Sequence, residues 1–216
     1  MNGSEQATSV EIYGLPVGPL EVNCYLVVDP ATRKALLVDP GAQAERIFEW
    51  CALHRAEVRL ILNTHGHGDH IGANGPLKEW FNVPLAIHPE DADCLLDPFV
   101  NLSAYFEPVT SPPADILLEP GSQVDWEGPP VEILHTPGHS PGSVSFHGDG
   151  WVISGDVLFQ GSIGRTDFPR CDLITLQTSI REQLLSLPEE TVVYPGHGPS
   201  TTIGHEKRTN PFLHLG

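Results

Sequence analysis

Positive charge is scarce in this sequence. Lys and Arg together number 11, against 28 Asp and Glu, and the formal net charge is −17. Binding to nucleic acid or to an anionic membrane requires a basic electrostatic field, so we expect neither partner. Two bound divalent cations would add four positive charges and still leave the chain strongly acidic. The charge therefore excludes the common polyanionic partners.

Cysteine is also sparse, and long apolar runs are absent. Cys24, Cys51, Cys94 and Cys171 are widely spaced and form no C-x-x-C pair, so we expect free, mostly buried thiols in a reducing compartment. The N-terminal MNGSEQATSV lacks the cationic and apolar stretches of a secretory signal. No run approaches the roughly 18 apolar residues that span a bilayer. These absences predict a soluble, cytoplasmic protein.

The remaining composition is that of a globular domain. The 216 residues are 40% hydrophobic and 18% charged, and 21 Gly and 21 Pro indicate many tight turns. Strand-like and helix-like segments alternate, so we predict one layered α/β domain over residues 1–216, with a flexible tail at 1–9. The expected strands cover 21–30, 35–41, 57–65, 83–89, 131–136, 143–148, 151–156 and 191–198, and the expected helices cover 41–55, about 69–81 and 172–187.

One short stretch is unusually rich in metal-binding side chains. Residues 61–72 read ILNTHGHGDHIG, with three histidines and an aspartate within six positions. In extended backbone, His65 and His67 point to the same side. Asp69 and His70 follow where a helix begins, so they can aim at a second, neighbouring point. This loop can therefore supply ligands to two adjacent ions.

The other ligands must come from distant segments. His139 and His197 each stand in a Pro-Gly-His turn after an apolar strand, and Asp156 ends the strand WVISGD. His139 can join His65 and His67, while His197 can join Asp69 and His70. The Asp156 carboxylate can bridge the two ions. Zinc is the expected metal, because imidazole and carboxylate are its usual ligands, with iron or manganese as alternatives.

Other histidines and one serine motif are expected to play no part in this chemistry. GHSPG at 138–142 fits the G-x-S-x-G nucleophile elbow, but that turn needs a backbone N–H after the serine and Pro141 has none. Ser140 is therefore expected only to shape the loop. The histidines assigned no metal role are His54, His88, His135, His147, His205 and His214.

The stretch from Thr64 to His70 resembles the T-H-x-H-x-D-H motif of the metallo-β-lactamase superfamily. Within it, the chain looks most like glyoxalase II and its small single-domain relatives, through TPGHSPGS, SGDVLFQGSIGRTDFP, VVYPGHGPST and NPFL. The resemblance spans roughly residues 10–213. It implies a four-layer αββα sandwich with the site at one edge between the sheets. The separate C-terminal helical domain of full-length glyoxalase II is not expected here.

The resemblance also implies an activity. A hydroxide bridging two metal ions, positioned by Asp69 and Asp156, would hydrolyse a glutathione-type or other small acyl thioester, such as an S-2-hydroxyacylglutathione. Arg165 follows the strand that carries Asp156, and it can meet a substrate carboxylate or pair with Asp167. The alternative activity is a mono-iron persulfide dioxygenase, which the same fold and a subset of the same ligands would serve.

Overall fold

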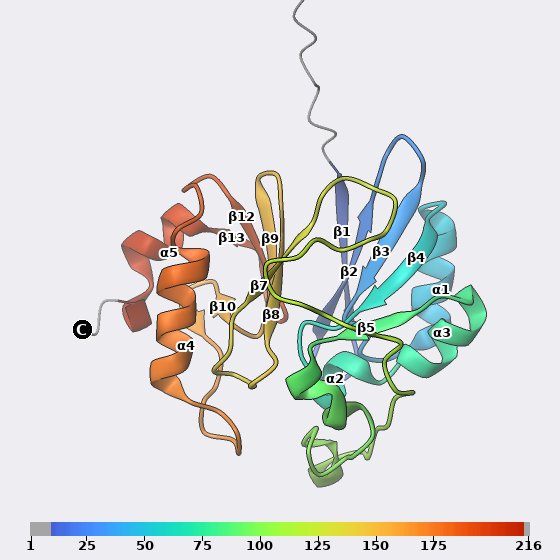
Figure 1. The fold of residues 1–216 in the computed structure, drawn as a ribbon, viewed down its shortest axis with the longest axis horizontal. Coiled ribbons are helices and arrows are strands. Elements are labelled where there is room, and N and C mark those ends of the chain that lie inside the picture. The colour runs from blue at the N-terminus through green and yellow to red at the C-terminus, as the bar shows by residue number, and fades with distance from the viewer. Residues whose placement is uncertain (1–9, 214–216) are drawn as a thin grey trace, which may run out of the picture.

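The computed structural model describes residues 10–213, and the expected tail at 1–9 lies outside them, as does His214. Two β-sheets face each other, and helices cover the outer face of each (Figure 1). The layers follow the order helix, sheet, sheet, helix. The predicted αββα sandwich is therefore confirmed.

The first sheet has the strand order β1-β2-β3-β4-β5-β6, antiparallel from β1 to β3 and parallel from β3 to β6. Its strands are β1 (Glu11–Val17), β2 (Val22–Val28), β3 (Lys34–Val38), β4 (Glu57–Leu62), β5 (Leu85–Ile87) and β6 (Ile116–Leu117). The outer helices are α1 (Ala44–Leu53) and α3 (Asn74–Phe81), preceded by the single turn α2 (Gly68–Ile71). Two 3₁₀ turns follow β5, η1 (Pro89–Leu95) and η2 (Ser103–Tyr105).

The second sheet has the order β13-β12-β9-β8-β7. Its strands are β7 (Glu132–His135), β8 (Val144–Gly148), β9 (Trp151–Gly155), β12 (Val192–Pro195) and β13 (Thr201–Thr202). A small hairpin, β10 (Leu158–Phe159) and β11 (Ser162–Ile163), follows β9. The outer face carries α4 (Leu173–Ser179), which continues as a π-helical turn (Ile180–Leu184), then α5 (Ile203–Thr209) and the short η4 (Pro211–Leu213).

Strand alternation explains why the layers hold together. All seven residues of β2 are buried: Leu26 packs under the outer helices of the first sheet, while the next residue, Val27, packs between the sheets. Phe146 and Ile153 approach from the second sheet into the same inner layer. A third apolar layer fills the space beneath α4 and α5. Strands buried on both faces read as continuous apolar runs, which is why the sequence revealed them.

The structure differs from the sequence-based expectation at several elements. The helix expected at 69–81 is two, because the chain turns at Gly72 and Ala73 between α2 and α3. The helix expected at 172–187 changes to π-helical hydrogen bonding at Ile180. Strand β1, the β10–β11 hairpin and α5 were not anticipated. None of these differences changes the edge of the sandwich at which the loops that follow β4, β7, β9 and β12 lie.

The two sheets are joined at that edge. The Val144 backbone N–H donates to the Thr64 carbonyl at 2.8 Å, and the Asn23 N–H donates to the Gly196 carbonyl at 2.7 Å. These bonds connect segments that are far apart in sequence. They tie the loop that follows β4 to β8 of the second sheet, and the loop that follows β12 to β2 of the first.

Candidate metal centre

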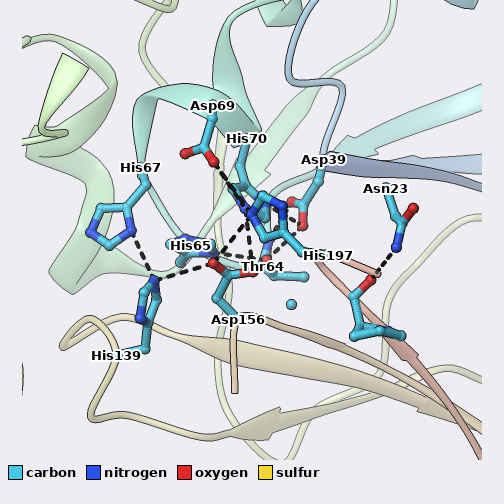
Figure 2. Close-up of polar contacts among 12 residues, drawn as sticks. Asn23, Asp39, Thr64, His65, His67, Asp69, His70, His139, Asp156 and His197 are labelled. Carbon is cyan, nitrogen blue, oxygen red and sulfur yellow. Dashed lines mark hydrogen bonds and ion pairs between the residues drawn. The ribbon is translucent and has the colours of Figure 1, made fainter. Parts of the chain in front are cut away.

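Seven side chains gather between the sheets, where four chain segments leave the C-terminal ends of β4, β7, β9 and β12 (Figure 2). They are His65, His67, Asp69, His70, His139, Asp156 and His197. They form three overlapping groups in which the potential ligand atoms lie within 4.8 Å of one another. All seven residues singled out in the sequence therefore meet in one place.

The first group consists of three imidazoles. The Nε2 atom of His139 lies 2.9 Å from Nδ1 of His67. The ring centroid of His65 lies 4.7 Å from that of His67 and 4.8 Å from that of His139, with the rings nearly perpendicular. In this arrangement, ring nitrogens from three directions face one small volume.

The second group contains Asp69, His70 and His197. Asp69 Oδ2 lies 3.4 Å from His197 Nε2 and 3.9 Å from His70 Nε2. Asp156 lies between the two groups: its Oδ2 is 3.6 Å from His139 Nε2 and 3.5 Å from His197 Nε2, while its Oδ1 is 3.5 Å from His70 Nε2. One carboxylate therefore faces imidazoles of both groups, as a bridging ligand must.

A cation fits this set of donors. His65 Nε2, His70 Nε2 and Asp156 Oδ1 are buried and have no hydrogen-bond partner. An unpaired buried polar atom costs about 1–3 kcal/mol, and native structures contain few of them. Three unpaired buried atoms in one cluster are therefore more than a native structure is expected to contain without a bound ligand. Metal ions held by imidazole nitrogen and carboxylate oxygen would satisfy all three atoms.

In four of the imidazoles, the Nδ1 atom already has a hydrogen-bond partner in the protein: those of His65, His70, His139 and His197. His139 Nδ1 donates to the Arg165 carbonyl at 2.9 Å, and His197 Nδ1 donates to the Leu20 carbonyl at 2.9 Å. For His65, the partner of Nδ1 is the Thr64 Oγ1 atom, 3.1 Å away. A second-shell acceptor of this kind fixes the ring and the tautomer, leaving Nε2 free to bind a metal.

Asp39 serves His70 in this way, and sequence reasoning missed it. Its Oδ2 lies 3.0 Å from His70 Nδ1 and accepts a 2.6 Å hydrogen bond from Thr64 Oγ1, while Oδ1 accepts from the Thr64 N–H at 2.8 Å. Asp39 has φ of 50°, an uncommon backbone conformation for a residue other than glycine. Its position directly after β3, parallel to β4, was the available signal.

Electrostatics divide the histidines into two kinds. Burial, together with neighbouring imidazoles, lowers the pKa of His65 well below its usual value and that of His67 to about 3. Both are neutral at pH 7, which is the form that binds metal. For His197, burial lowers the pKa, but hydrogen bonds to Asp156 and Asp69 outweigh it and raise the pKa to about 9.

The carboxylates stay ionised. Burial would raise the pKa of Asp156, but the charge of His70 outweighs it and holds this pKa well below the ordinary value. Asp69 behaves in the same way, with its pKa lowered mainly by His70 against the effect of burial. The cluster therefore offers two anionic oxygen ligands at neutral pH.

Arg165 lies beside the cluster, and its side chain pairs with Asp167. The guanidinium donates to the carboxylate through Nε at 2.9 Å and Nη2 at 2.7 Å, and it lies 4.2 Å over the Phe168 ring. Phe168 in turn faces His67, with ring centroids 6.4 Å apart. A contact between Arg165 and a substrate stays a prediction.

Within residues 10–213, the remaining histidines and the serine motif lie outside the cluster. His88, Glu90 and His135 do approach one another, but the two rings are stacked almost parallel, 4.5 Å apart, so their in-plane lone pairs do not converge. His135 Nε2 also lies 3.0 Å from the Pro141 carbonyl. Ser140 is buried and its hydroxyl donates to Asp91 at 2.6 Å, which fits the structural role expected for it.

An αββα sandwich with a His- and Asp-lined edge of this kind is typical of metal-dependent hydrolases. The chain belongs to the metallo-beta-lactamase superfamily, whose profile matches residues 17–197. It is 41% identical over 207 residues to the hydroxyacylglutathione hydrolase GloC of Haemophilus influenzae, covering 92% of this chain and 96% of GloC.

Solved structures agree. The BLEG-1 B3 metallo-beta-lactamase superimposes with a TM-score of 0.91 at 40% identity, covering 94% of this chain and all of BLEG-1. The di-iron-bound form of TTHA1623 superimposes with a TM-score of 0.83 at 40% identity, covering 93% of this chain and all of TTHA1623. The resemblance therefore extends over nearly the whole of each relative.

Proposed function

We propose that the protein is a binuclear thioester hydrolase whose leading substrate is an S-2-hydroxyacylglutathione or a similar small acyl thioester. The observation that carries the proposal is the cluster of seven converging ligands, in which three buried ligand atoms have no protein partner. The similarity to GloC, which is named a hydroxyacylglutathione hydrolase, supports the choice of substrate.

The ligands divide into two sites joined by Asp156. His65, His67 and His139 would hold one ion, and Asp69, His70 and His197 the other. Two divalent ions so held would lower the pKa of a shared water toward about 7 and supply a nucleophile at neutral pH. Zinc is the expected metal. The iron in TTHA1623 belongs to that relative and makes iron the first alternative to test.

The carboxylates have separate tasks in this proposal. The Asp156 side chain is only 12% exposed, and its two oxygens set the separation of the two imidazole groups. The Asp69 side chain is 26% exposed, so it can orient the attacking water from the solvent side. The water would first lose one proton to solvent. Its oxygen would then bond to the acyl carbon while the carbon–sulfur bond breaks. The sulfur would leave as a thiolate that needs little acid assistance, and the acid product would release its remaining proton to become a carboxylate.

Arg165 is the proposed contact for a substrate carboxylate. Its side chain is 65% exposed, and a solvent-exposed ion pair such as that with Asp167 contributes little stability, so the guanidinium can exchange partners. Its place over Phe168, which faces His67, puts it beside the metal ligands.

The proposal includes a cytoplasmic setting and a small-molecule partner. Cys24, Cys51 and Cys94 are buried and free, and Cys171 is free and partly buried, in keeping with a reducing compartment. Among residues 10–213, no helix is both long and apolar enough to cross a bilayer. The strong negative charge disfavours nucleic acid as substrate.

Metal counting followed by a substrate panel tests the proposal. Elemental analysis should find two divalent ions per chain. A panel of acyl thioesters of glutathione and of other thiols should then show release of free thiol. A β-lactam, added because of the BLEG-1 resemblance, is followed separately by the loss of its ring absorbance. Two ions with no thioester cleavage would refute the thioesterase activity, and fewer than two would refute the binuclear centre.

A mono-iron persulfide dioxygenase is the second candidate, because His65, His67 and His139 form a complete three-ligand group by themselves. An oxygen electrode separates the two candidates. Persulfide-dependent oxygen uptake with one iron per chain would favour the dioxygenase. The second group, Asp69, His70 and His197, would then have no metal to bind, and for this reason hydrolysis is preferred.

A further inference from the structure

Asp91 is a buried carboxylate that contacts both histidine-bearing loops and that the chemistry above does not use. It lies in η1, is fully buried, and accepts three hydrogen bonds. Its Oδ2 accepts from the Gly66 N–H at 3.0 Å and from Ser140 Oγ at 2.6 Å. Its Oδ1 accepts from the Gly142 N–H at 2.9 Å.

The three donors belong to only two loops, those that carry the ligands of the three-imidazole group. Gly66 lies between His65 and His67, and Ser140 directly follows His139. Asp91 therefore connects the backbone of the His65–His67 segment, which belongs to the first sheet, with the loop that carries His139 from the second sheet. None of its hydrogen bonds is made to the loop that carries His197.

The packing around Asp91 leaves no room for adjustment. A Cβ atom on Gly142 would lie 2.7 Å from the Asp91 carboxyl carbon. A Cβ atom on Gly66 would lie 3.0 Å from the Asp91 carbonyl oxygen and 2.3 Å from Cys94 Cβ. Both loops thus approach η1 closely enough that only glycine fits at the two facing positions. The carboxylate lies between two backbones that it holds at a fixed distance.

We propose that Asp91 is a positioning residue that sets the distance between the His65–His67 pair and His139, and so controls the metal affinity of the three-imidazole site without affecting the Asp69–His70–His197 site. This proposal rests on the binuclear centre proposed above. Outer-shell groups that orient ligands typically change metal affinity by about 10–100-fold when altered. We expect a change of that size, confined to one of the two ions.

Asp91→Asn is the informative substitution because it changes the hydrogen bonding and leaves the volume unchanged. An amide nitrogen at the Oδ2 position would face the Gly66 N–H, and at the Oδ1 position it would face the Gly142 N–H. Either orientation puts two donors against each other, so one loop must move away. Ser140→Ala, which removes a single one of the three hydrogen bonds, is a milder second variant.

Asp29→Asn is a matched control. Asp29 is also buried and also accepts hydrogen bonds, from the Ala31 N–H at 2.9 Å and Thr32 Oγ1 at 2.6 Å. Asp29 follows the C-terminal end of β2, whereas the N-terminal residue of that strand, Val22, pairs with His197 at the metal centre. Asp29 is therefore at the end of the strand that is remote from the metal centre. A loss of general stability should therefore appear in both variants, whereas a loss of one metal site should appear only in Asp91→Asn.

Stepwise zinc titration of metal-free protein, followed by NMR of the histidine ring nitrogens, is the test. In wild-type protein, two equivalents should bind tightly. In Asp91→Asn, the signals of His70 and His197 should respond at the wild-type zinc concentration. The signals of His65, His67 and His139 should require about 10–100-fold more free zinc.

Each result has one interpretation. Ser140→Ala should shift the same site in the same direction by a smaller factor, and this measurement decides the question if Asp91→Asn does not fold. Equal weakening of both sites, unchanged binding, or the same effect in Asp29→Asn would overturn the role given to Asp91. Fewer than two ions in the wild-type protein would instead overturn the binuclear centre itself.

Discussion

Asp156→Ala is the substitution expected to damage the proposed centre most. The lost carboxylate faces three imidazole nitrogens at 3.5–3.6 Å, belonging to His70, His139 and His197. Removing one partner from a buried set of charges costs about 3–5 kcal/mol. If the same amount is lost from the free energy of metal binding, metal affinity should fall by roughly two to three and a half orders of magnitude, at 1.4 kcal/mol per factor of ten.

The assay follows directly from this magnitude. Purified Asp156→Ala protein should contain no more than one ion by elemental analysis, and thioester hydrolysis should be lost. Its far-ultraviolet circular dichroism should match wild type, because the strand β9 that precedes residue 156 is held by its neighbours β8 and β12. Asp29→Ala, a buried aspartate at the far end of β2, is the control and should keep both ions.

One result would refute the reasoning. If Asp156→Ala retained two ions and a kcat/KM within a few-fold of wild type, Asp156 would not be a ligand. The unpartnered Oδ1 atom would then need another explanation. Loss of both ions from Asp29→Ala as well would show that metal content simply reports stability.

Four further outcomes are expected. His135→Ala should keep both ions in elemental analysis, since its ring is stacked on His88; loss of an ion would make the His88–Glu90–His135 group a metal site. Arg165→Ala should raise KM for a carboxylate-bearing thioester with little change in kcat, and an unchanged KM would remove Arg165 from the substrate site. Because the pKa of His197 is raised to about 9, zinc binding to metal-free protein at pH 7.5 should release more protons from wild type than from His197→Ala, and this difference should disappear above pH 9, as measured by calorimetry in buffers of different ionisation heat. Treatment with a chelator should abolish hydrolysis and lower the melting temperature, and zinc should restore both; a melting temperature that ignored metal would contradict binding to the folded state.

The sign of the His197 effect also extends to the fold. Its pKa in the folded, metal-free protein lies above the unfolded value of about 6.5. The stabilisation from its contacts with Asp69 and Asp156 is therefore complete below pH 6.5 and is lost as the pH rises through about 9. Thermal melts of chelated protein across this range, beside His197→Ala, would measure it.

The convergence of the seven side chains could be predicted because each belongs to a local pattern. His65 and His67 alternate in extended backbone, and His139 and His197 each follow a Pro-Gly turn at a strand end. Strand ends on one side of a layered α/β domain meet at a common edge. Local spacing therefore predicted the set of ligands, while the resemblance to the metallo-β-lactamase superfamily implied that the site lies at the edge between the two sheets.

Asp39 and Asp91 could not be found in this way, because their partners are remote. Asp39 looks like an ordinary strand-ending Asp-Pro, and its role depends on Thr64 and His70 coming beside it. Asp91 lies in an irregular proline-rich segment and is bonded to Ser140, 49 residues away. Side-chain contacts between such distant segments leave no periodic signal in the sequence.

The same limit applies to the helices. Apolar spacing predicted continuous helices over 69–81 and 172–187, but the first is interrupted between α2 and α3, and the second shifts to π-helical bonding at Ile180. In the first case, the Ala73 N–H donates to the Pro40 carbonyl at 2.9 Å instead of to a carbonyl within α2. Gly72 beside it lies against the same segment, since a Cβ atom on Gly72 would be 2.4 Å from the Gly41 carbonyl oxygen. Periodicity reports which faces are apolar, and it does not report such contacts.

Two of the groups that orient the imidazoles are backbone carbonyls, those of Leu20 and Arg165, and both residues have exposed side chains. What each contributes to ring orientation is independent of the residue type at that position. If the proposed hydrolase activity is right, the side chains at 20 and 165 can thus be changed while the imidazoles stay in place. A saturation library at these two positions should yield altered substrate preference with a constant metal content.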